Sequence, residues 1–360
     1  MKGRALAGVV FSIVKHISVW SAACYTTMMR LRYVTDEVPG FSRAKGFFGV
    51  AYRDEKGGKI RNRKILDRIR SLGIPPAYTN VWICPFVNGH IQATALDARR
   101  RKQYIYHPDW IAKQNEGKFH RMSEFVAALP RIRRKVESDL RLRGMPKEKV
   151  LAAIVRLLDT AFIRIGNEEY AKDNHSFGLT TLRNRHVKGT GEHMELAFDG
   201  KDGIAHEFPI EDERLRKIVA ICHDIPGQKL FEYIDHDGRP HDVQSDDVNE
   251  YLKSISKEEI TAKDFRTWHG TVIAASYLWD RPVAKTKRDV QRDIKVAVQR
   301  AADALGNTVA VCKKSYIHPD VLSLYAKGKL TWKAPRETLR KKYPLLHVHE
   351  VGLMQLLEKL

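Results

Sequence analysis

Cysteine is scarce in this chain, and the spacing of the cysteines argues against stabilisation by disulfide bonds or by a zinc site. The 360 residues include four cysteines. They are scattered, and no pair has the Cys-x-x-Cys spacing of zinc ligands or of a redox pair. The sequence therefore indicates neither a disulfide framework nor a zinc site, and it suits a reducing compartment. The four are Cys24, Cys84, Cys222 and Cys312.

Long apolar runs are lacking too, since none is long enough to span a bilayer. The segment M-K-G-R-A-L-A-G-V-V-F-S-I-V has a basic start and a short apolar run, like the first half of a secretory signal. No clean cleavage region follows it. We therefore expect residues 1–30 to be an N-terminal extension, either disordered or preceding a true start at Met28 or Met29. We expect no membrane partner.

Three familiar catalytic patterns are also missing. The sequence has neither a phosphate-binding loop of the Walker type nor a His-Glu-x-x-His zinc pair. No set of carboxylates indicates a two-metal nuclease. The segment D-H-D-G at 235–238 lacks the full spacing of a calcium loop and predicts a turn, and His347 and His349 are expected at the surface. We therefore expect no metal ion and no cofactor.

What the chain has in excess is positive charge. It contains 63 lysine and arginine residues against 43 aspartate and glutamate residues, so its formal net charge is +20 and its pI is near 9.7. Lysine and arginine that neutralise phosphates release counterions, so this excess favours a polyanionic partner. The alternative is a basic enzyme with a solvated surface, and nucleic acid is the favoured partner of the two readings.

The residue pattern changes once along the chain. Residues 31–110 contain short apolar or alternating runs separated by turn signals, which predict a small, mostly antiparallel β-rich domain. The strongest hairpin signal is Asn88-Gly89, which follows an apolar run at 81–87. The other predicted strands lie at 47–52 and 102–106, and a short amphipathic segment lies at 65–72.

Residues 111–360 have mainly helical periodicity. Within them, 193–198 and 204–210 alternate and predict a hairpin with Lys201 near its tip. Gly306 is placed to end one helix and Pro319 to begin another. The predicted helical segments are 123–129, 150–161, 248–255, 265–278 and 290–305. The fold class that follows is α+β, with a small antiparallel β-rich N-terminal domain and a larger, mainly α-helical domain.

Four polar residues stand in unusual surroundings. Arg164 lies in the apolar run I-R-I-G-N-E-E-Y, and Arg266 has aromatic neighbours. A buried arginine is uncommon unless it is paired. Taken singly, each residue has an ordinary explanation: a structural ion pair for either arginine, a solvated turn for Lys201, and packing for Tyr316.

Together, these side chains are the groups needed to break a phosphodiester without a metal ion. The guanidinium of arginine presents a rigid fork of donors to two oxyanion oxygens. Neighbouring cations favour the phenolate form of tyrosine, whose unperturbed pKa is about 10. A lysine can give a proton to the departing sugar oxygen.

Arg164, Arg266 and Tyr316 stand in longer motifs, and through such motifs the chain resembles the small type IB DNA topoisomerases, the bacterial relatives of the poxvirus enzyme. The resemblance covers nearly everything from L-R-Y-V-T-D-E-V-P-G at 31–40 to the end. Many long matches in one order make it specific. They include I-P-P-A-Y-T-N-V-W-I-C (74–84), R-I-G-N-E-E-Y-A-K-D-N (164–174), T-A-K-D-F-R-T-W (261–268) and L-G-N-T-V-A-V-C-K-K-S-Y-I-H-P (305–319).

The resemblance implies a role for each catalytic position. Tyr316 matches the nucleophile that forms a 3′-phosphotyrosyl bond to DNA. Arg164 and Arg266 match the pair that holds the scissile phosphate, and Lys201 matches the general acid to the 5′-oxygen. Asn307 stands where the poxvirus enzyme has a histidine. An amide there can donate the same hydrogen bond but brings no charge.

The resemblance also implies DNA contacts outside the catalytic set. Gln103, Tyr104, Tyr106 and Tyr170 align with family residues that touch DNA near the site. Asn167 and Glu169 stand where the poxvirus enzyme has lysines, so the sequence does not predict the same preference for a cleavage site.

The expected function is therefore relaxation of supercoiled duplex DNA by a type IB topoisomerase, independent of ATP and metal. The resemblance implies a monomer that clamps double-stranded DNA in the cytoplasm, associated with the nucleoid. Two alternatives fit the same residues. A tyrosine recombinase shares the chemistry, although such enzymes usually have histidine where this chain has Lys263, three residues before Arg266. A DNA-binding protein with a silent site would share the charge.

Overall fold

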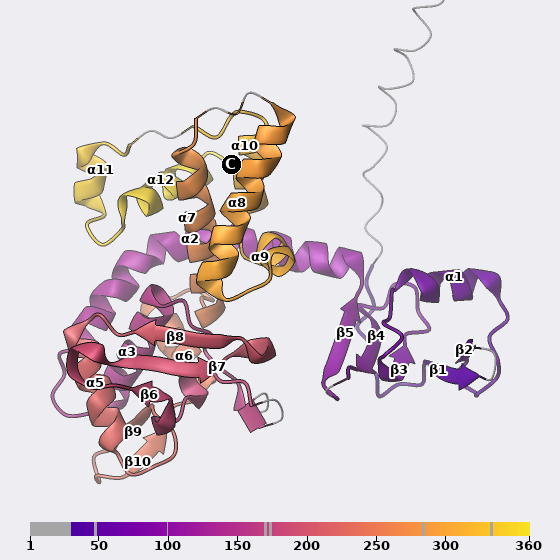
Figure 1. The fold of residues 1–360 in the computed structure, drawn as a ribbon, viewed down its shortest axis with the longest axis horizontal. Helices are drawn as coiled ribbons and strands as arrows, with labels where there is room; N and C mark the ends of the chain where they lie inside the picture. Colours follow the sequence, from indigo (N-terminus) through magenta and orange to yellow (C-terminus); the bar gives the residue numbers. More distant parts are fainter. Residues whose placement is uncertain are drawn as a thin grey trace, which may run out of the picture. The chain divides into compact units, whose positions relative to one another are not determined.

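The described part of the chain forms two compact units. The computed structural model describes residues 30–360, apart from 47, 48, 99, 169, 170, 173, 174, 283, 285, 332 and 333. The expected extension at 1–30 thus lies outside the described residues except for Arg30. One unit ends at Glu116 and the other comprises Gly117–Leu360. The division falls inside the long helix α2 (Pro108–Asp139), which Figure 1 labels.

The first unit is an antiparallel sheet with one helix. Its strands are ordered β2-β1-β3-β4-β5. Helix α1 (Arg63–Ser71) is preceded by the N-cap residue Asn62, whose Oδ1 accepts a hydrogen bond of 3.0 Å from the Lys64 amide. Its buried Ile69 shares one apolar core with the strands. The strands are β1 (Phe41–Gly46), β2 (Gly49–Arg53), β3 (Thr79–Ile83), β4 (Ile91–Leu96) and β5 (Lys102–Tyr106).

The strand predicted at 81–87 is wrong at its end. Strand β3 stops at Ile83, and the segment up to His90 connects it to β4. Pro85 has no N–H to give to a strand ladder, which explains the early end. Asn88-Gly89 therefore lies in a longer loop and is not a two-residue hairpin turn. The antiparallel pairing of the flanking strands is as predicted.

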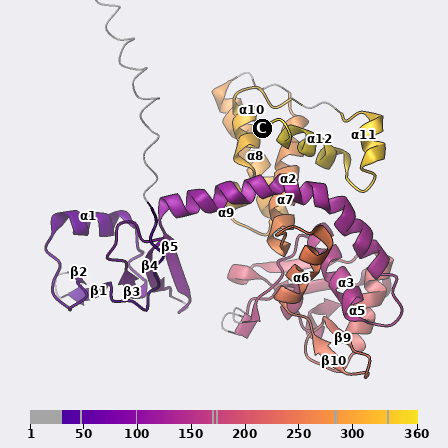
Figure 2. The same ribbon diagram turned by 180° about the vertical axis from the view of Figure 1, so that it is seen from behind.

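The second unit is mainly helical, and α7 (Ala262–Trp279) lies at its centre. This helix is buried along most of its length, so it has neighbours on several sides. It packs against α8 (Lys287–Leu305) and α12 (Val348–Leu357), as Figures 1 and 2 show from opposite sides. The other helices are α3 (Lys147–Thr160), α5 (Glu213–Asp224), α6 (Ser245–Ser256), α9 (Val309–Ser315), α10 (Pro319–Ala326) and α11 (Glu337–Lys342).

The predicted hairpin around Lys201 is confirmed. Strands β7 (Glu195–Asp199) and β8 (Ala205–Pro209) pair in antiparallel register, with Asp199 opposite Ala205, and Lys201 lies in the connecting turn. Strand β6 (Val187–Lys188) completes this small sheet. The turn predicted at 235–238 is also present, between β9 (Glu232–Ile234) and β10 (Pro240–Asp242).

Two helix boundaries agree with their sequence signals. Gly306 has φ of +57° and ends α8 in the left-handed conformation that glycine tolerates. Pro319 is the first residue of α10, where its missing N–H costs nothing. The predicted class is confirmed: an antiparallel N-terminal sheet precedes a mainly helical region.

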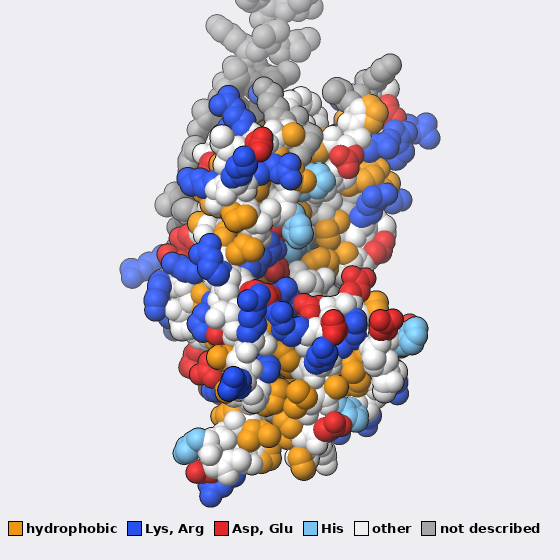
Figure 3. Space-filling view, turned by 90° about the vertical axis from the view of Figure 1, so that its left-hand side faces the viewer, with side chains coloured by type: hydrophobic (Ala, Val, Ile, Leu, Met, Phe, Trp, Pro, Cys, Tyr) orange, Lys and Arg blue, Asp and Glu red, His pale blue; other side chains and the backbone are white. Residues whose placement is uncertain are grey.

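Charge and apolarity at the surface follow the composition. On the face shown in Figure 3, lysine and arginine side chains gather across the middle of the surface, with acidic side chains interspersed among them. Within the described residues, no helix combines the length and apolarity that crossing a membrane would take. The described cysteines Cys84, Cys222 and Cys312 are all buried.

Candidate active site

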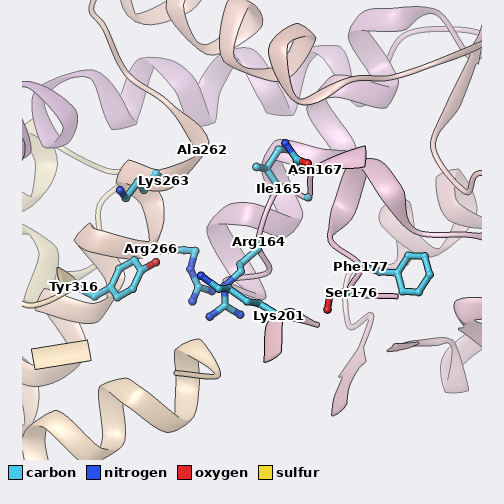
Figure 4. A pocket seen from close by; sticks show the side chains of 11 residues that line it. Arg164, Ile165, Asn167, Ser176, Phe177, Lys201, Ala262, Lys263, Arg266 and Tyr316 are labelled. Atoms are coloured by element: carbon cyan, nitrogen blue, oxygen red, sulfur yellow. The ribbon is translucent and has the colours of Figure 1, made fainter. Parts of the chain in front are cut away.

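A basic pocket of roughly 340 Å³ lies in the second unit, where four chain segments meet. The strand-poor segment after α3 brings Arg164, the β7–β8 turn brings Lys201, helix α7 brings Arg266, and the end of α9 brings Tyr316. Figure 4 shows the Tyr316 ring directed toward Arg266, with Arg164 and Lys201 beside it. All four residues singled out from the sequence as a catalytic set thus line one cavity.

Backbone carbonyls hold Arg266, and none of the described carboxylates forms an ion pair with it. Its side chain is buried, and its two Nη atoms donate to the carbonyls of Phe162 and Leu305, the latter at 2.6 Å. Burial and the nearby Arg164 lower the pKa of Arg266 to about 10, so it stays charged at neutral pH. Its Nε is buried and has no hydrogen-bond partner among the described residues. A buried charge without an acidic partner is costly, which marks a place for an anion.

Arg164 and Asn307 form a second part of the site. An Nη of Arg164 donates to the Oδ1 of Asn307 and, at 3.1 Å, to the carbonyl of Gly306. Because a guanidinium can only donate, the oxygen of the amide must face it. The Nδ2 group of Asn307 is therefore turned away, and it is buried without a hydrogen-bond partner among the described residues. The Arg266 Nε and the Asn307 Nδ2 can thus both donate a hydrogen bond to a ligand oxygen.

The backbone of Tyr316 packs against helix α7. Tyr316 is the C-cap of α9, and its carbonyl accepts from the Thr271 hydroxyl at 3.3 Å. A Cβ at Gly270 would lie 2.6 Å from the Tyr316 carbonyl oxygen, so only glycine allows this approach. The half-buried ring lies 5.2 Å from the Arg266 guanidinium carbon, measured to the ring centroid.

Lys201 and Lys263 add further positive charge at the pocket. Both line it, Lys201 from the exposed hairpin turn and Lys263 from the first turn of α7. Cys312 lies four residues before Tyr316 in α9 and is fully buried. Burial raises the pKa of its thiol to about 11. That thiol is therefore a packing group at neutral pH.

Sequence reasoning missed Lys118, which the fold brings beside the tyrosine. Its Nζ lies 5.0 Å from the centroid of the Tyr316 ring and is buried without a hydrogen-bond partner among the described residues. Burial, with help from Lys263, lowers the pKa of Lys118 to about 8. No local signal marks this residue, because it stands in the ordinary basic sequence of α2.

The predicted DNA contacts lie on β5 in the first unit where they are described. Tyr104 and Tyr106 are exposed and stacked, with ring centroids 5.9 Å apart. Alternation along the strand places them on one face, and Lys102 lies 5.5 Å from the Tyr104 ring centroid. Gln103 is on the other face and donates to Asp97 at 3.0 Å. The predicted contact Tyr170 lies outside the described residues.

The described residues hold no group of three or more histidine, cysteine, aspartate or glutamate side chains with the geometry of a metal site. What the pocket offers instead is a set of fixed cations around a phenol. Such a set suits a reaction at a phosphate, where negative charge grows in the transition state.

Two family models match the sequence. One is described as the catalytic core of eukaryotic DNA topoisomerase I and matches residues 102–343. The other is described as the N-terminal domain of bacterial DNA topoisomerase IB and matches residues 49–97. The pocket lies entirely within the first of these matches.

Curated relatives give the same picture. The chain is 31% identical over 291 residues to the DNA topoisomerase 1B of Acanthamoeba polyphaga mimivirus, which covers 76% of this chain and 87% of that protein. It is 24% identical over 234 residues to the DNA topoisomerase 1B of vaccinia virus (strain Copenhagen), covering 63% and 70%. It is 24% identical over 240 residues to the DNA topoisomerase 1 of Mycosarcoma maydis, covering 60% and 23%.

Proposed function

The chain belongs to the type IB DNA topoisomerase family, and on that premise we propose that Tyr316 is the nucleophile with which it breaks one DNA strand. As a member of this family it is an isomerase, and its substrate is DNA. In the proposed reaction the protein becomes joined to the 3′-phosphate, the duplex beyond the break swivels, and the strand is resealed. The product is relaxed DNA.

The observation that carries the proposal is the convergence of Tyr316, Arg164, Arg266 and Lys201 on one pocket. These residues come from segments far apart in the sequence, and each has an ordinary explanation only when taken alone. Two of them are arginines, whose guanidinium groups present the fork of donors that suits the oxygens of a phosphate.

In the proposed first step the Tyr316 hydroxyl gives up its proton to solvent, its oxygen attacks phosphorus, and the bond to the 5′-oxygen breaks. The phosphorane that forms carries extra negative charge on its non-bridging oxygens. Arg164, Arg266 and the free Nδ2 of Asn307 donate to those oxygens, so their stabilisation grows toward the transition state. Lys201 gives its proton to the 5′-oxygen as that oxygen leaves.

Resealing is the reverse of this step. The 5′-hydroxyl attacks the phosphotyrosyl ester, Lys201 takes the proton back, and the Tyr316 oxygen leaves and takes up a proton from solvent. The ester conserves the energy of the broken bond, so ATP is not needed. The phenol is a better leaving group than a sugar alcohol because its pKa is lower.

The two alternatives are not favoured. The matches are to topoisomerase families, and Lys263 occupies the position where recombinases usually have histidine. A silent DNA-binding protein would have no need to keep a nucleophile, a general acid and two arginines around one cavity.

We also propose how the two parts of the chain are used. Residues 31–110 form a clamp domain whose Tyr104 and Tyr106 touch the duplex, with Gln103 and Tyr170 as further contacts, and residues 111–360 form the catalytic domain. One chain supplies the whole pocket, which supports a monomer clamping double-stranded DNA. The proposed location is the cytoplasm, in association with the nucleoid.

Incubation of the purified protein with supercoiled plasmid, in EDTA and without ATP, tests the proposal. We expect wild-type protein to give relaxed topoisomers and, after denaturation, a protein–DNA adduct on a gel. Tyr316→Phe should bind the plasmid but lose relaxation by several orders of magnitude, because the attacking oxygen is gone. Tyr343→Phe, at a half-buried tyrosine outside the pocket, is the matched control and should relax DNA normally.

A covalent adduct formed by Tyr316→Phe would contradict the assignment of the nucleophile. Untouched plasmid with folded wild-type protein would contradict the reaction itself.

A further inference from the structure

His206 occupies the inward face of the hairpin that carries Lys201. Strand β8 alternates between exposed and half-buried residues, and His206 and Phe208 are the half-buried ones. His206 lies opposite the buried Phe198 across the pair of strands. Its ring is 5.5 Å from the Phe208 ring at an interplanar angle of 19°, and 5.4 Å from the Phe198 ring. The imidazole therefore faces the body of the unit and not solvent.

The imidazole fills the space between two glycines from different segments. A Cβ at Gly200 would lie 2.4 Å from the His206 Cδ2 and 2.5 Å from its Nε2. A Cβ at Gly306 would lie 2.4 Å from the His206 Cε1. Atoms never approach a real Cβ this closely, so the ring touches the backbone of both glycines.

Each of these glycines precedes a residue of the active site. Gly200 comes directly before Lys201, and Gly306 comes directly before Asn307. The carbonyl of Gly306 also accepts the hydrogen bond from Arg164. The ring thus lies between the turn that carries the proposed proton donor and the segment that holds the proposed phosphate site.

The backbone conformation of Gly200 does not itself require glycine, so lack of space must be the reason for glycine at this position. Its φ of −87° and ψ of −164° can be adopted by residues with a side chain. A side chain is excluded at this position because the His206 ring already fills the space. Gly306, in contrast, has φ of +57° and would be glycine for its helix-ending role alone. Gly200 is therefore the informative position.

The charge state of the ring suits a packing role. The charged groups that face it are Arg164, Arg266 and Asp199. Burial, together with the two guanidinium groups, lowers the pKa of His206 below its ordinary value. The imidazole is therefore neutral at neutral pH and adds no repulsion beside the arginines.

We propose that His206 is a positioning residue whose ring, wedged between Gly200 and Gly306, sets Lys201 at the distance from the phosphate site that proton transfer needs. The inference rests on the proposed function, in which Lys201 is the general acid. It assigns His206 no contact with DNA and no part in proton transfer.

A sulfur leaving group isolates the step that His206 serves. In a duplex with a 5′-bridging phosphorothiolate at a cleavage site first mapped with wild-type protein, attack by Tyr316 breaks a P–S bond and the thiolate leaves without a proton. Loss of a general acid slows cleavage of the oxygen substrate and spares the sulfur substrate. A fault in the phosphate site or in folding slows both.

His206→Ala should therefore behave as a partial copy of Lys201→Ala. We expect cleavage of the oxygen substrate to slow by about 10- to 100-fold, the scale of an ångström-sized misplacement, and cleavage of the sulfur substrate to change by less than about threefold. His206→Phe keeps a flat ring in the same space and should retain most of the rate on both substrates. Thermal melting and duplex binding establish that each variant is folded.

Gly200→Ala tests the wedge from the other side. Its methyl group should push the ring away and slow the oxygen substrate, again with rescue by sulfur. In the His206→Ala background the same methyl group meets an empty space, so adding it should cost nothing further. Non-additivity of this kind is expected only of groups in contact.

Three outcomes would overturn the inference while leaving Tyr316 and Lys201 in their roles: equal slowing of both substrates by His206→Ala, no slowing at all, or strictly additive losses for the two substitutions. Failure of sulfur to rescue Lys201→Ala is a different result. It would remove the general acid from the proposed function, and the positioning role with it, whereas the adduct formed by Tyr316 would still be tested on its own.

Discussion

At the scale of single residues, Lys118 is a charge that the fold holds at a cost to stability. Its pKa of about 8 in the folded protein lies below the ordinary 10.5, so the unfolded chain holds the proton more tightly. Between these two values the unfolded state binds more protons, and stability rises with pH. Below about pH 8 the cost is present in full, on the order of 3 kcal/mol for a shift of this size.

Lys118→Met should therefore raise the melting temperature at pH 7, since it replaces a buried ammonium by an apolar chain of similar length. The gain should shrink as the pH is raised from about 8 toward 10.5. We expect the same variant to form the Tyr316 adduct more slowly, because it removes a cation 5.0 Å from the ring of the proposed nucleophile.

Melting curves at several pH values and single-turnover cleavage measure the two effects. Lys113→Met, at an exposed lysine of the same helix, is the control and should change neither. A variant of Lys118 that is less stable than wild type at pH 7 would show that the amine has a partner in solution.

The site residues predicted from the sequence lie in long recognisable motifs, whereas those that were missed do not. Arg164, Arg266 and Tyr316 stand inside long motifs, so a resemblance could single them out before any fold was known. Lys118 and His206 stand in no such motif here. Each gains its importance from a segment distant in the sequence, Lys118 from Tyr316 and His206 from Gly306, and only the fold makes that contact.

At the scale of helices, a buried polar network ties α12 to the rest of the second unit. Arg133 of α2 donates to Asp159 of α3 at 2.7 Å and to Glu350 of α12 at 2.7 Å. Two residues of the central helix α7 join in: Trp268 donates to Glu350 at 2.8 Å, and the His269 Nε2 lies 2.9 Å from Asp159. Four helices thus meet around one arginine.

This network should make the free energy of unfolding fall at acid pH. Burial opposes the charged forms of both acids. The hydrogen bonds from His269 and Arg133 nevertheless hold the pKa of Asp159 below its ordinary value, and those from Arg133 do the same for Glu350. The unfolded chain binds these protons first, so the stabilisation is present above about pH 4.5 and is lost as the pH falls through the lowered values. Glu350→Gln should cost roughly 3 kcal/mol at pH 7, because it leaves Arg133 less well compensated, and should lose less on acidification.

Melting temperature measured from pH 7 down to pH 3 checks this. Glu358→Gln, at an exposed glutamate at the end of the same helix, should follow the wild-type curve. Parallel acid curves for Glu350→Gln and wild type would mean that the network carries no stability of its own.

The elements that could be predicted from the sequence are those whose position is set by residues within or next to them in the chain. The hairpin around Lys201 was predictable because alternating strands flank a glycine-rich turn, and the end of α8 because Gly306 follows a helical run. The strand through 87 was overextended because an apolar run continues past Pro85, where the ladder cannot. Helix α5 is absent from the predicted helices although Leu215, Val219 and Cys222 have helical spacing, so that omission was one of interpretation.

At the scale of the whole chain, the net charge of +20 should govern DNA binding. The pocket concentrates cationic side chains. In the first unit, Tyr104 and Lys102 form an aromatic and basic surface, where the Lys102 Nζ also pairs with Asp36 at 2.7 Å. Each phosphate that these groups neutralise releases counterions, so the logarithm of the binding constant should fall linearly with the logarithm of salt concentration.

Binding of Tyr316→Phe to a labelled duplex, followed by fluorescence anisotropy, measures this slope without covalent trapping. With six or more phosphate contacts, affinity should fall by about 10³-fold or more between 50 and 200 mM salt. Lys102→Ala should reduce the slope by roughly one contact, whereas Tyr104→Ala should lower affinity at every salt concentration with little change in slope, because stacking releases no counterions. A flat salt dependence would mean that the excess charge faces something other than the duplex, and equal slopes for Lys102→Ala and wild type would place β5 away from the phosphates.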